Sequence, residues 1–268
     1  MPLPNPARQK AARDKLSALL AHPPSVFAIH YACQSFDEAP EAGGSLRAVC
    51  IALRRFDSGQ VTTFSIAKIA ELARIAPDNI PQYLDYLERT MLGEFYAFVH
   101  TTRGARYVHW HMRDDRFGFA ALEHRLTVLK GRPEHIPDDS RIDLARIIPD
   151  IYGDDFVLAG AKLQALGERN GLSMSGFLAG AAEADAVTAG RYRDVLASTL
   201  TKVRVIAEVA ERANARTLVT DAGFVARHGG PFRLAVNKLI ENPAYSIAAA
   251  MAGGFVVVLK AYDWLFGS

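Results

Sequence analysis

Three strand-like runs follow one another early in the chain, and they constrain the fold more than any other feature. Apolar, β-branched and aromatic residues concentrate at residues 25–33, 46–55 and 60–66. A Pro-, Glu- and Gly-rich stretch separates the first two runs, and DSGQ, which has the composition of a hairpin turn, separates the last two. We therefore expect three consecutive strands at the start of the fold.

A helix and a fourth strand are expected next. Residues 80–100 place their apolar side chains on one helical stripe, and residues 106–112 return to a strand pattern. Strand, helix and strand in this order imply a crossover connection, which favours a mixed α/β sheet. Beyond residue 116 helix signals dominate, and we expect helices at 117–129, 141–152, 156–171, 173–187 and 189–216. The fold class is therefore α/β, with a mixed-sheet first half and a mostly helical second half.

The chain divides into four predicted parts. Residues 1–22 contain a basic amphipathic helix at 6–21, which we expect to dock on its own domain. Residues 23–190 form the α/β domain, and residues 191–240 form a helical extension. In that extension an apolar stripe including Val195, Val203 and Val209 faces the core, opposite charged residues that include Lys202 and Arg204. Residues 241–268 form a hydrophobic terminal helix.

The charge balance excludes a strong general attraction to anionic partners. Lys and Arg number 31 against 29 Asp and Glu, so the net charge is only +2, and binding to nucleic acid requires a local basic patch. The two cysteines, Cys33 and Cys50, both fall in predicted strands. We expect free, buried thiols and an intracellular setting.

The carboxyl-terminal segment leaves two interpretations open. Residues 246–259 carry no charge, and aromatic residues stand on both sides of that run within 245–266. The first interpretation is a membrane anchor that holds the protein at the inner face of the membrane, with its bulk in the cytoplasm because the basic residues lie on the amino side. The small residues at 248–254 would then allow a homo-oligomer. The second interpretation is a helix packed into the domain or a partner.

The stretch HWHMRDD, residues 109–115, is the candidate site. Residues i and i+2 of a strand share a face, so His109 and His111 could ligate one metal together with Asp114 and Asp115. Glu123 and His124 offer further ligands nearby. The alternative is a hydrogen-bonded histidine pair under the next helix, with the aspartates capping the start of that helix.

Three stretches, FAIHYACQSF, HWHMRDD and FLAGAAEADAV, occur in an order that resembles the RNase H-like superfamily, and within it the DEDD-type 3′–5′ exonucleases. The resemblance covers about residues 25 to 190. It implies catalytic carboxylates at Asp114, Asp115 and Asp185, and divalent metals, Mg or Mn, that activate water. Ala32 and Gln34 stand where that family has its first Asp and Glu, and neither can bridge two metals.

The sequence therefore favours a nucleic-acid-associated protein with a degenerate, non-cleaving exonuclease-like domain. The predicted phosphate contacts are Arg54, Arg55, Arg125 and Lys130. One alternative is a membrane-anchored sensor, effector or interaction protein. The other is an active metal-dependent nuclease.

Overall fold

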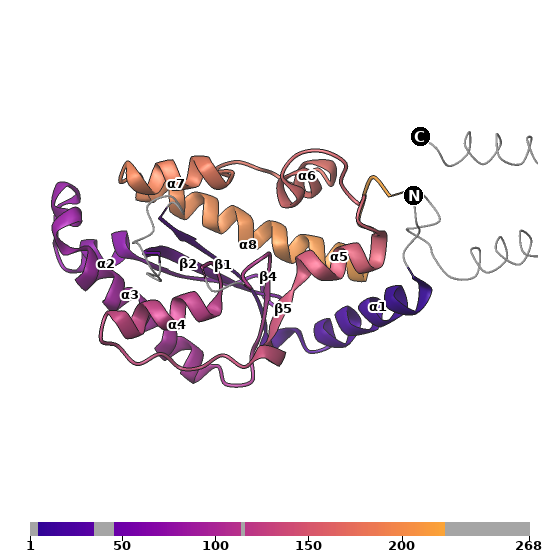
Figure 1. Ribbon diagram of the computed structural model, residues 1–268, viewed down its shortest axis with the longest axis horizontal. Coiled ribbons are helices and arrows are strands. Elements are labelled where there is room, and N and C mark those ends of the chain that lie inside the picture. Colours follow the sequence, from indigo (N-terminus) through magenta and orange to yellow (C-terminus); the bar gives the residue numbers. More distant parts are fainter. Residues whose placement is uncertain (1–4, 35–45, 114–115, 223–268) are drawn as a thin grey trace, which may run out of the picture.

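One five-stranded mixed sheet organises the part of the chain that the structure, a computed structural model, describes, namely residues 5–34, 46–113 and 116–222 (Figure 1). Its order is β3-β2-β1-β4-β5. The strands are β1 (Val26–Cys33), β2 (Ala48–Arg55), β3 (Val61–Ser65), β4 (Arg106–His109) and β5 (Arg141–Asp143). β2 is antiparallel to β1 and β3, whereas β4 is parallel to β1 and β5. β1, β3, β4 and β5 therefore run in the same direction.

Helices cover both faces of the sheet and make the molecule three layers deep (Figure 1). The helices are α1 (Pro6–Leu20), α2 (Ile66–Leu72), α3 (Leu84–Thr101), α4 (Phe119–Val128), α5 (Leu144–Tyr152), α6 (Lys162–Arg169), α7 (Gly180–Thr188) and α8 (Tyr192–Asn214). One core lies between the sheet and α3 and α4, and the other lies between the sheet and α1, α5, α6 and α8. The expected α/β class, with a mostly helical second half, is confirmed.

The residues of β1 explain the two cores. Phe27, Ile29 and Tyr31 alternate along the strand and fill the core under α3 and α4. On the other face stands the small residue Ala28, and Ala52 of β2 belongs to the same core. Small side chains let the long helix α8 lie close against the two central strands.

The three opening strands are confirmed within about two residues at each end, but several later elements differ from the prediction. The helix expected at 141–152 begins only at residue 144, because Arg141–Asp143 pairs with β4 as strand β5. The fourth strand ends at His109 and does not continue to residue 112. The helices expected from residues 156 and 173 begin later, as α6 and α7.

The helical second half packs directly on the sheet. Val203, Ile206 and Val209 of α8 are fully buried in the core beneath β1 and β2, so the predicted core-facing stripe is confirmed. Lys202 is a correction, because the prediction placed it on the solvent side and the structure buries it to 6% exposure. At the other end of the chain, Leu16 of α1 is buried against α5 and α8.

The cysteines and the hydrophobic tail complete the comparison with the sequence. Cys33 and Cys50 are free and buried, as expected. Within the described residues no helix is both long and apolar enough to cross a membrane. The segment 245–266, proposed as an anchor, lies outside the described residues.

Candidate functional site

The carboxyl ends of β1, β4 and β5 meet at one edge of the sheet. These three strands are parallel, and in open α/β sheets ligands bind outside the carboxyl ends of parallel strands. β4 ends at His109 and β5 ends at Asp143, and these two residues are paired across the sheet. The strand register therefore brings an imidazole and a carboxylate together at this edge.

Asp143 orders the turn that follows β4. Its Oδ1 accepts hydrogen bonds from the backbone N–H of Ala145, at 3.0 Å, and of His111, at 3.2 Å. The first bond caps the amino end of α5. Its Oδ2 lies 2.7 Å from Nη1 of Arg113 in an ion pair. Asp143 was not among the predicted site residues, because the sequence pattern placed it in the first turn of the helix expected at 141–152.

His109 is held as a neutral ring. Its Nδ1 accepts a hydrogen bond from the backbone N–H of Met112 at 3.1 Å, which assigns the ring proton to Nε2. Burial lowers the pKa of His109 to about 4, although the carboxylate of Asp143, 3.9 Å away, opposes the shift. Because Nδ1 is already occupied, a metal could reach only Nε2.

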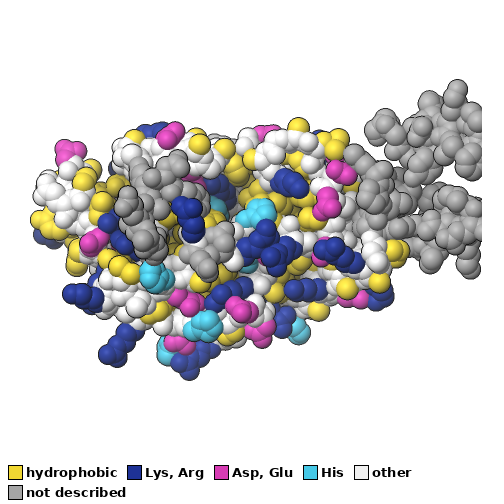
Figure 2. Space-filling model, viewed as in Figure 1, with side chains coloured by type: hydrophobic (Ala, Val, Ile, Leu, Met, Phe, Trp, Pro, Cys, Tyr) yellow, Lys and Arg dark blue, Asp and Glu magenta, His cyan; other side chains and the backbone are white. Residues whose placement is uncertain are grey.

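His111 lies beyond the end of β4 and is exposed. Its backbone is in the left-handed region, with φ of 61°, so the strand alternation that predicted a shared face with His109 does not extend to it. Partial burial of the ring lowers its pKa, the carboxylate of Asp143 opposes that shift, and the cations Arg113, Lys162 and Arg146 lower the pKa further. His111 therefore stands in a cationic neighbourhood, and Figure 2 shows Lys and Arg side chains gathered over the ends of β4 and α5.

A cavity of about 220 Å³ opens at this edge. The side chains that line it are His109, Met112, Arg113, Phe119, Ala120, Asp138, Arg141, Asp143 and Arg146. Three guanidinium groups thus face two carboxylates. Arg141 pairs with Glu123 and Asp138, and its Nε has no hydrogen-bond partner within the described residues. Arg146 is 71% exposed, and its nearest carboxylate oxygen is 3.9 Å away. We call Arg113, Arg146 and Lys162, together with the neighbouring neutral ring of His111, the cationic edge.

The described residues do not fit a two-metal centre. No group of three or more His, Cys, Asp and Glu side chains that could hold a metal ion occurs among them. Asp114 and Asp115, predicted as metal ligands and catalytic acids, lie outside the described residues. Ala32 is buried in β1, and the amide oxygen of Gln34 accepts from the backbone N–H of Arg47 at 3.4 Å. Of the two carboxylates that line the cavity, Asp143 is paired with Arg113 and Asp138 with Arg141.

The buried acid of α7 is Glu183, whereas Asp185, the predicted third catalytic acid, is exposed. Nζ of Lys202 lies 2.7 Å from Oε1 of Glu183, and the hydroxyl of Ser198 donates to the same oxygen at 2.7 Å. Nε2 of His30 is 3.9 Å from Oε2, which is too long for a hydrogen bond. Burial opposes the ionisation of Glu183, but its contacts with His30 and Lys202 outweigh burial and lower its pKa to about 2.

This cluster of His30, Glu183, Ser198 and Lys202 joins β1, α7 and α8 inside the protein. The side chains of Glu183 and Lys202 are only 11% and 7% exposed. The sequence held a signal for it, because residue 202 lies seven after Val195 and seven before Val209 on the buried stripe of α8. The cluster is a structural ion pair, and it lines none of the cavities described here.

The four predicted phosphate contacts do not lie on one surface. Arg54 and Arg55 pair with Ala28 and Phe27 near the start of β1, whereas Arg125 reaches the other end of β2. Seven residues of strand separate these ends, which is about 23 Å. Lys130 is exposed at the end of α4.

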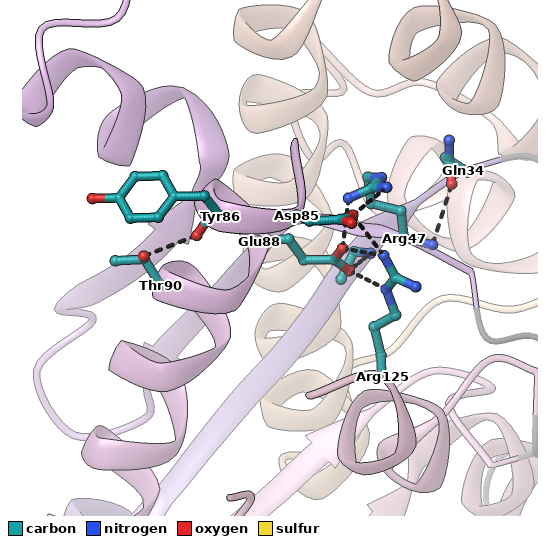
Figure 3. Close-up of polar contacts among 8 residues, drawn as sticks. Gln34, Arg47, Asp85, Tyr86, Glu88, Thr90 and Arg125 are labelled. Carbon is teal, nitrogen blue, oxygen red and sulfur yellow. Dashed lines mark hydrogen bonds and ion pairs between the residues drawn. The ribbon is translucent and has the colours of Figure 1, made fainter. Parts of the chain in front are cut away.

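Arg125 is turned inward and belongs to a second buried ion-pair cluster (Figure 3). Its guanidinium makes two hydrogen bonds to Glu88, at 2.9 and 2.7 Å, and Arg47 makes a third at 2.9 Å. The backbone N–H of Ala48 also donates to Glu88, whose side chain is 0% exposed. Asp85, 73% exposed, pairs with both arginines from the rim. The cluster ties α3, α4 and the start of β2 together.

Comparison with known proteins adds no assignment to this geometry. No protein-family model matches the chain, and no curated protein matches it.

Proposed function

We propose that this protein binds nucleic acid through the cationic edge and does not cleave it. The arrangement of the strands supports the resemblance to the RNase H-like superfamily, because three antiparallel strands, a helix and a parallel fourth strand follow in the implied order. Under this proposal, the metal-binding site of that superfamily is degenerate in this chain. No activity follows from the fold alone, so the proposal rests on the residues at the edge.

The observation that most directly supports this proposal is the group of cations around Asp143. Arg113, Arg146 and Lys162 lie close enough to His111 to lower its pKa, and Arg146 holds its guanidinium largely in solvent. Guanidinium groups bind phosphate oxygens through paired N–H donors, and phosphate contacts supply most of the affinity for nucleic acid. The cations of this edge suit a phosphate backbone better than they suit a divalent cation.

The proposed lack of cleavage follows from the same residues. Two-metal hydrolysis needs carboxylates that are free to bridge the metals. At this edge β1 offers Ala32 and Gln34, and the carboxylate of Asp143 is engaged by Arg113 and by the N-cap of α5. A metal brought here would also meet the repulsion of the cationic edge.

The test is fluorescence anisotropy with labelled single-stranded and duplex oligonucleotides, starting at about 50 mM salt. We expect binding that weakens steeply with salt, and the variant Arg146→Ala is expected to bind more weakly, with a salt slope smaller by about one. Arg8→Ala removes the same charge from α1, at an arginine 73% exposed, and is the matched control. Arg55→Ala probes the opposite edge of the sheet.

Three results would count against the proposal. Absence of binding at low salt removes it. Loss of binding in Arg55→Ala but not in Arg146→Ala places the interface at the other edge. Cleavage of the oligonucleotides in magnesium or manganese, lost in Asp114→Asn or Asp115→Asn, establishes an active nuclease instead.

A further inference from the structure

A second hollow, of 640 Å³, lies between the end of α2 and the start of α3. It is lined by Ala73, Arg74, Ile75, Ala76, Asn79, Tyr83 and Tyr86. Its side chains combine two aromatic rings, one guanidinium and one amide. Neither the cationic edge nor the two buried ion-pair clusters contributes a residue to it.

The two tyrosines are exposed to solvent. Tyr83 is 46% exposed and Tyr86 is 55% exposed, and they stand three residues apart, on the same side of the first turn of α3. The ring of Tyr86 points away from the Glu88 cluster (Figure 3). Within the described residues neither hydroxyl has a hydrogen-bond partner. Two open rings beside a hollow offer flat apolar surfaces to a ligand.

Arg74 supplies the charge of this hollow. It follows α2 with a left-handed backbone, φ of 57°, and its N–H bonds to the carbonyl of Glu71. Its guanidinium has no ion-pair partner in the part of the chain that the structure describes, and the residue is exposed. Asn79 adds an amide that can donate and accept hydrogen bonds. An anionic ligand with flat rings complements this set of groups.

The hollow and the cationic edge both lie beyond the carboxyl ends of the parallel strands. β3 runs in the direction of β1 and β4, and α2 begins directly at its carboxyl end. β3 and β5 are the two outer strands, so four strand spacings, about 19 Å, separate them, and the seven residues of α2, about 10 Å of helix, lie between β3 and the hollow. A linear polyanion that lies along the carboxyl ends of the strands can therefore reach both places.

We infer that this hollow stacks the bases of a single-stranded nucleic acid on Tyr83 and Tyr86, with Arg74 contacting its backbone. The inference rests on the proposed function, and it names the class of nucleic acid that the protein binds. Bases of a single strand present their faces to aromatic side chains, whereas bases in a duplex are already stacked on each other. The cationic edge then holds the phosphates farther along the strand.

The test compares binding of a single strand of about 15 nucleotides, the matching duplex, and an abasic strand of equal length. We expect the double variant Tyr83→Ala/Tyr86→Ala to lose about tenfold or more in affinity for the single strand and none for the duplex. Tyr83→Phe/Tyr86→Phe keeps the rings and is expected to bind like the unaltered protein. The abasic strand is expected to bind the unaltered protein as weakly as the single strand binds the alanine variant.

Arg74→Gly is the second variant, and it keeps the inference testable if the alanine variant fails to fold. Glycine suits the left-handed backbone at this position, so the fold is expected to be retained while single-strand affinity falls. Unchanged single-strand binding in both Arg74→Gly and the alanine variant overturns the inference but leaves the proposed function standing. If the unaltered protein binds none of the three probes, the proposed function fails as well.

Discussion

Replacing Lys202 by methionine tests the reasoning about the protein interior. The side chains of Lys202 and Glu183 are 7% and 11% exposed, and their charged atoms are 2.7 Å apart. Methionine keeps the length and apolar part of the lysine side chain, so the change removes mainly the charge. Breaking a buried pair on one side typically costs about 3–5 kcal/mol, because the remaining charge is left buried. We expect a loss of this size in the free energy of unfolding at pH 7.

The pH dependence of that loss is the sharper readout. In the unaltered protein the pKa of Glu183 is lowered to about 2 from its usual 4.5, so its stabilisation is present above pH 4.5 and is lost as the pH falls toward 2. In Lys202→Met, burial acts on Glu183 without the ammonium group and raises its pKa. Protonation of Glu183 then relieves the buried charge, so the difference in stability between the two proteins should shrink as the pH falls from 7 to 4.

The assay is urea denaturation of the full chain, followed by circular dichroism across this pH range. Lys10→Met is the matched control, since it breaks an exposed pair with Asp14 and should cost less than about 1 kcal/mol. Adding Glu183→Gln to Lys202→Met removes the stranded charge and should recover much of the loss. The reasoning is refuted if Lys202→Met costs no more than the control, or if its deficit grows as the pH falls.

Three further predictions concern the other buried groups. Glu88→Gln leaves two guanidinium groups without their buried carboxylate and should lower the free energy of unfolding, measured by urea denaturation, by about 3 kcal/mol or more. The exposed Asp85→Asn should lower it by less than about 1 kcal/mol. Equal losses in the two variants would contradict the buried cluster. Burial raises the pKa of the Cys33 and Cys50 thiols to about 12, so both should resist a thiol reagent at pH 8 until the protein unfolds. Rapid labelling of either thiol in the folded protein would disprove this. Burial lowers the pKa of His109 to about 4, so its ring resonances in NMR should not titrate between about pH 7 and 5.5. Its contribution to the free energy of unfolding should be full above pH 6.5 and should be lost as the pH falls toward 4. A titration midpoint near 6.5 would exclude the buried neutral ring.

The sequence predicts the sheet well where a strand is long and poorly where it is short. β1, β2 and β3 show runs of β-branched and aromatic residues bounded by turn signals, and all three are confirmed. β5 has only three residues, Arg141–Asp143, and they continue without a break into the apolar spacing of α5. Periodicity cannot separate the two, because the pairing with β4 that defines β5 is a contact between distant parts of the chain.

The sequence pointed to the end of the fourth strand as a candidate site, and that site stays a prediction. Residues 109–113 of that stretch lie at the carboxyl end of β4, and His109 faces a cavity, whereas Asp114 and Asp115 lie outside the described residues. The partner of His109 across the sheet, Asp143, was missed for the same reason as β5. Lys202 was misplaced because its charge was weighed more heavily than its spacing, although a lysine can be buried when a carboxylate pairs with it.

Asp143, the carboxylate at the end of β5, has a structural role at this edge. Asp143 accepts two backbone N–H groups and one guanidinium, which fixes the turn after β4 and the start of α5 in a single arrangement. The same pairing with Arg113 neutralises the carboxylate, and among the described residues Arg146 and Lys162 add two further positive charges near it. A carboxylate that is consumed in holding the turn cannot also hold a metal, but the turn it holds carries Arg113 and His111 to the surface. These contacts are the reason for proposing an anionic ligand at this edge in place of metal-dependent hydrolysis.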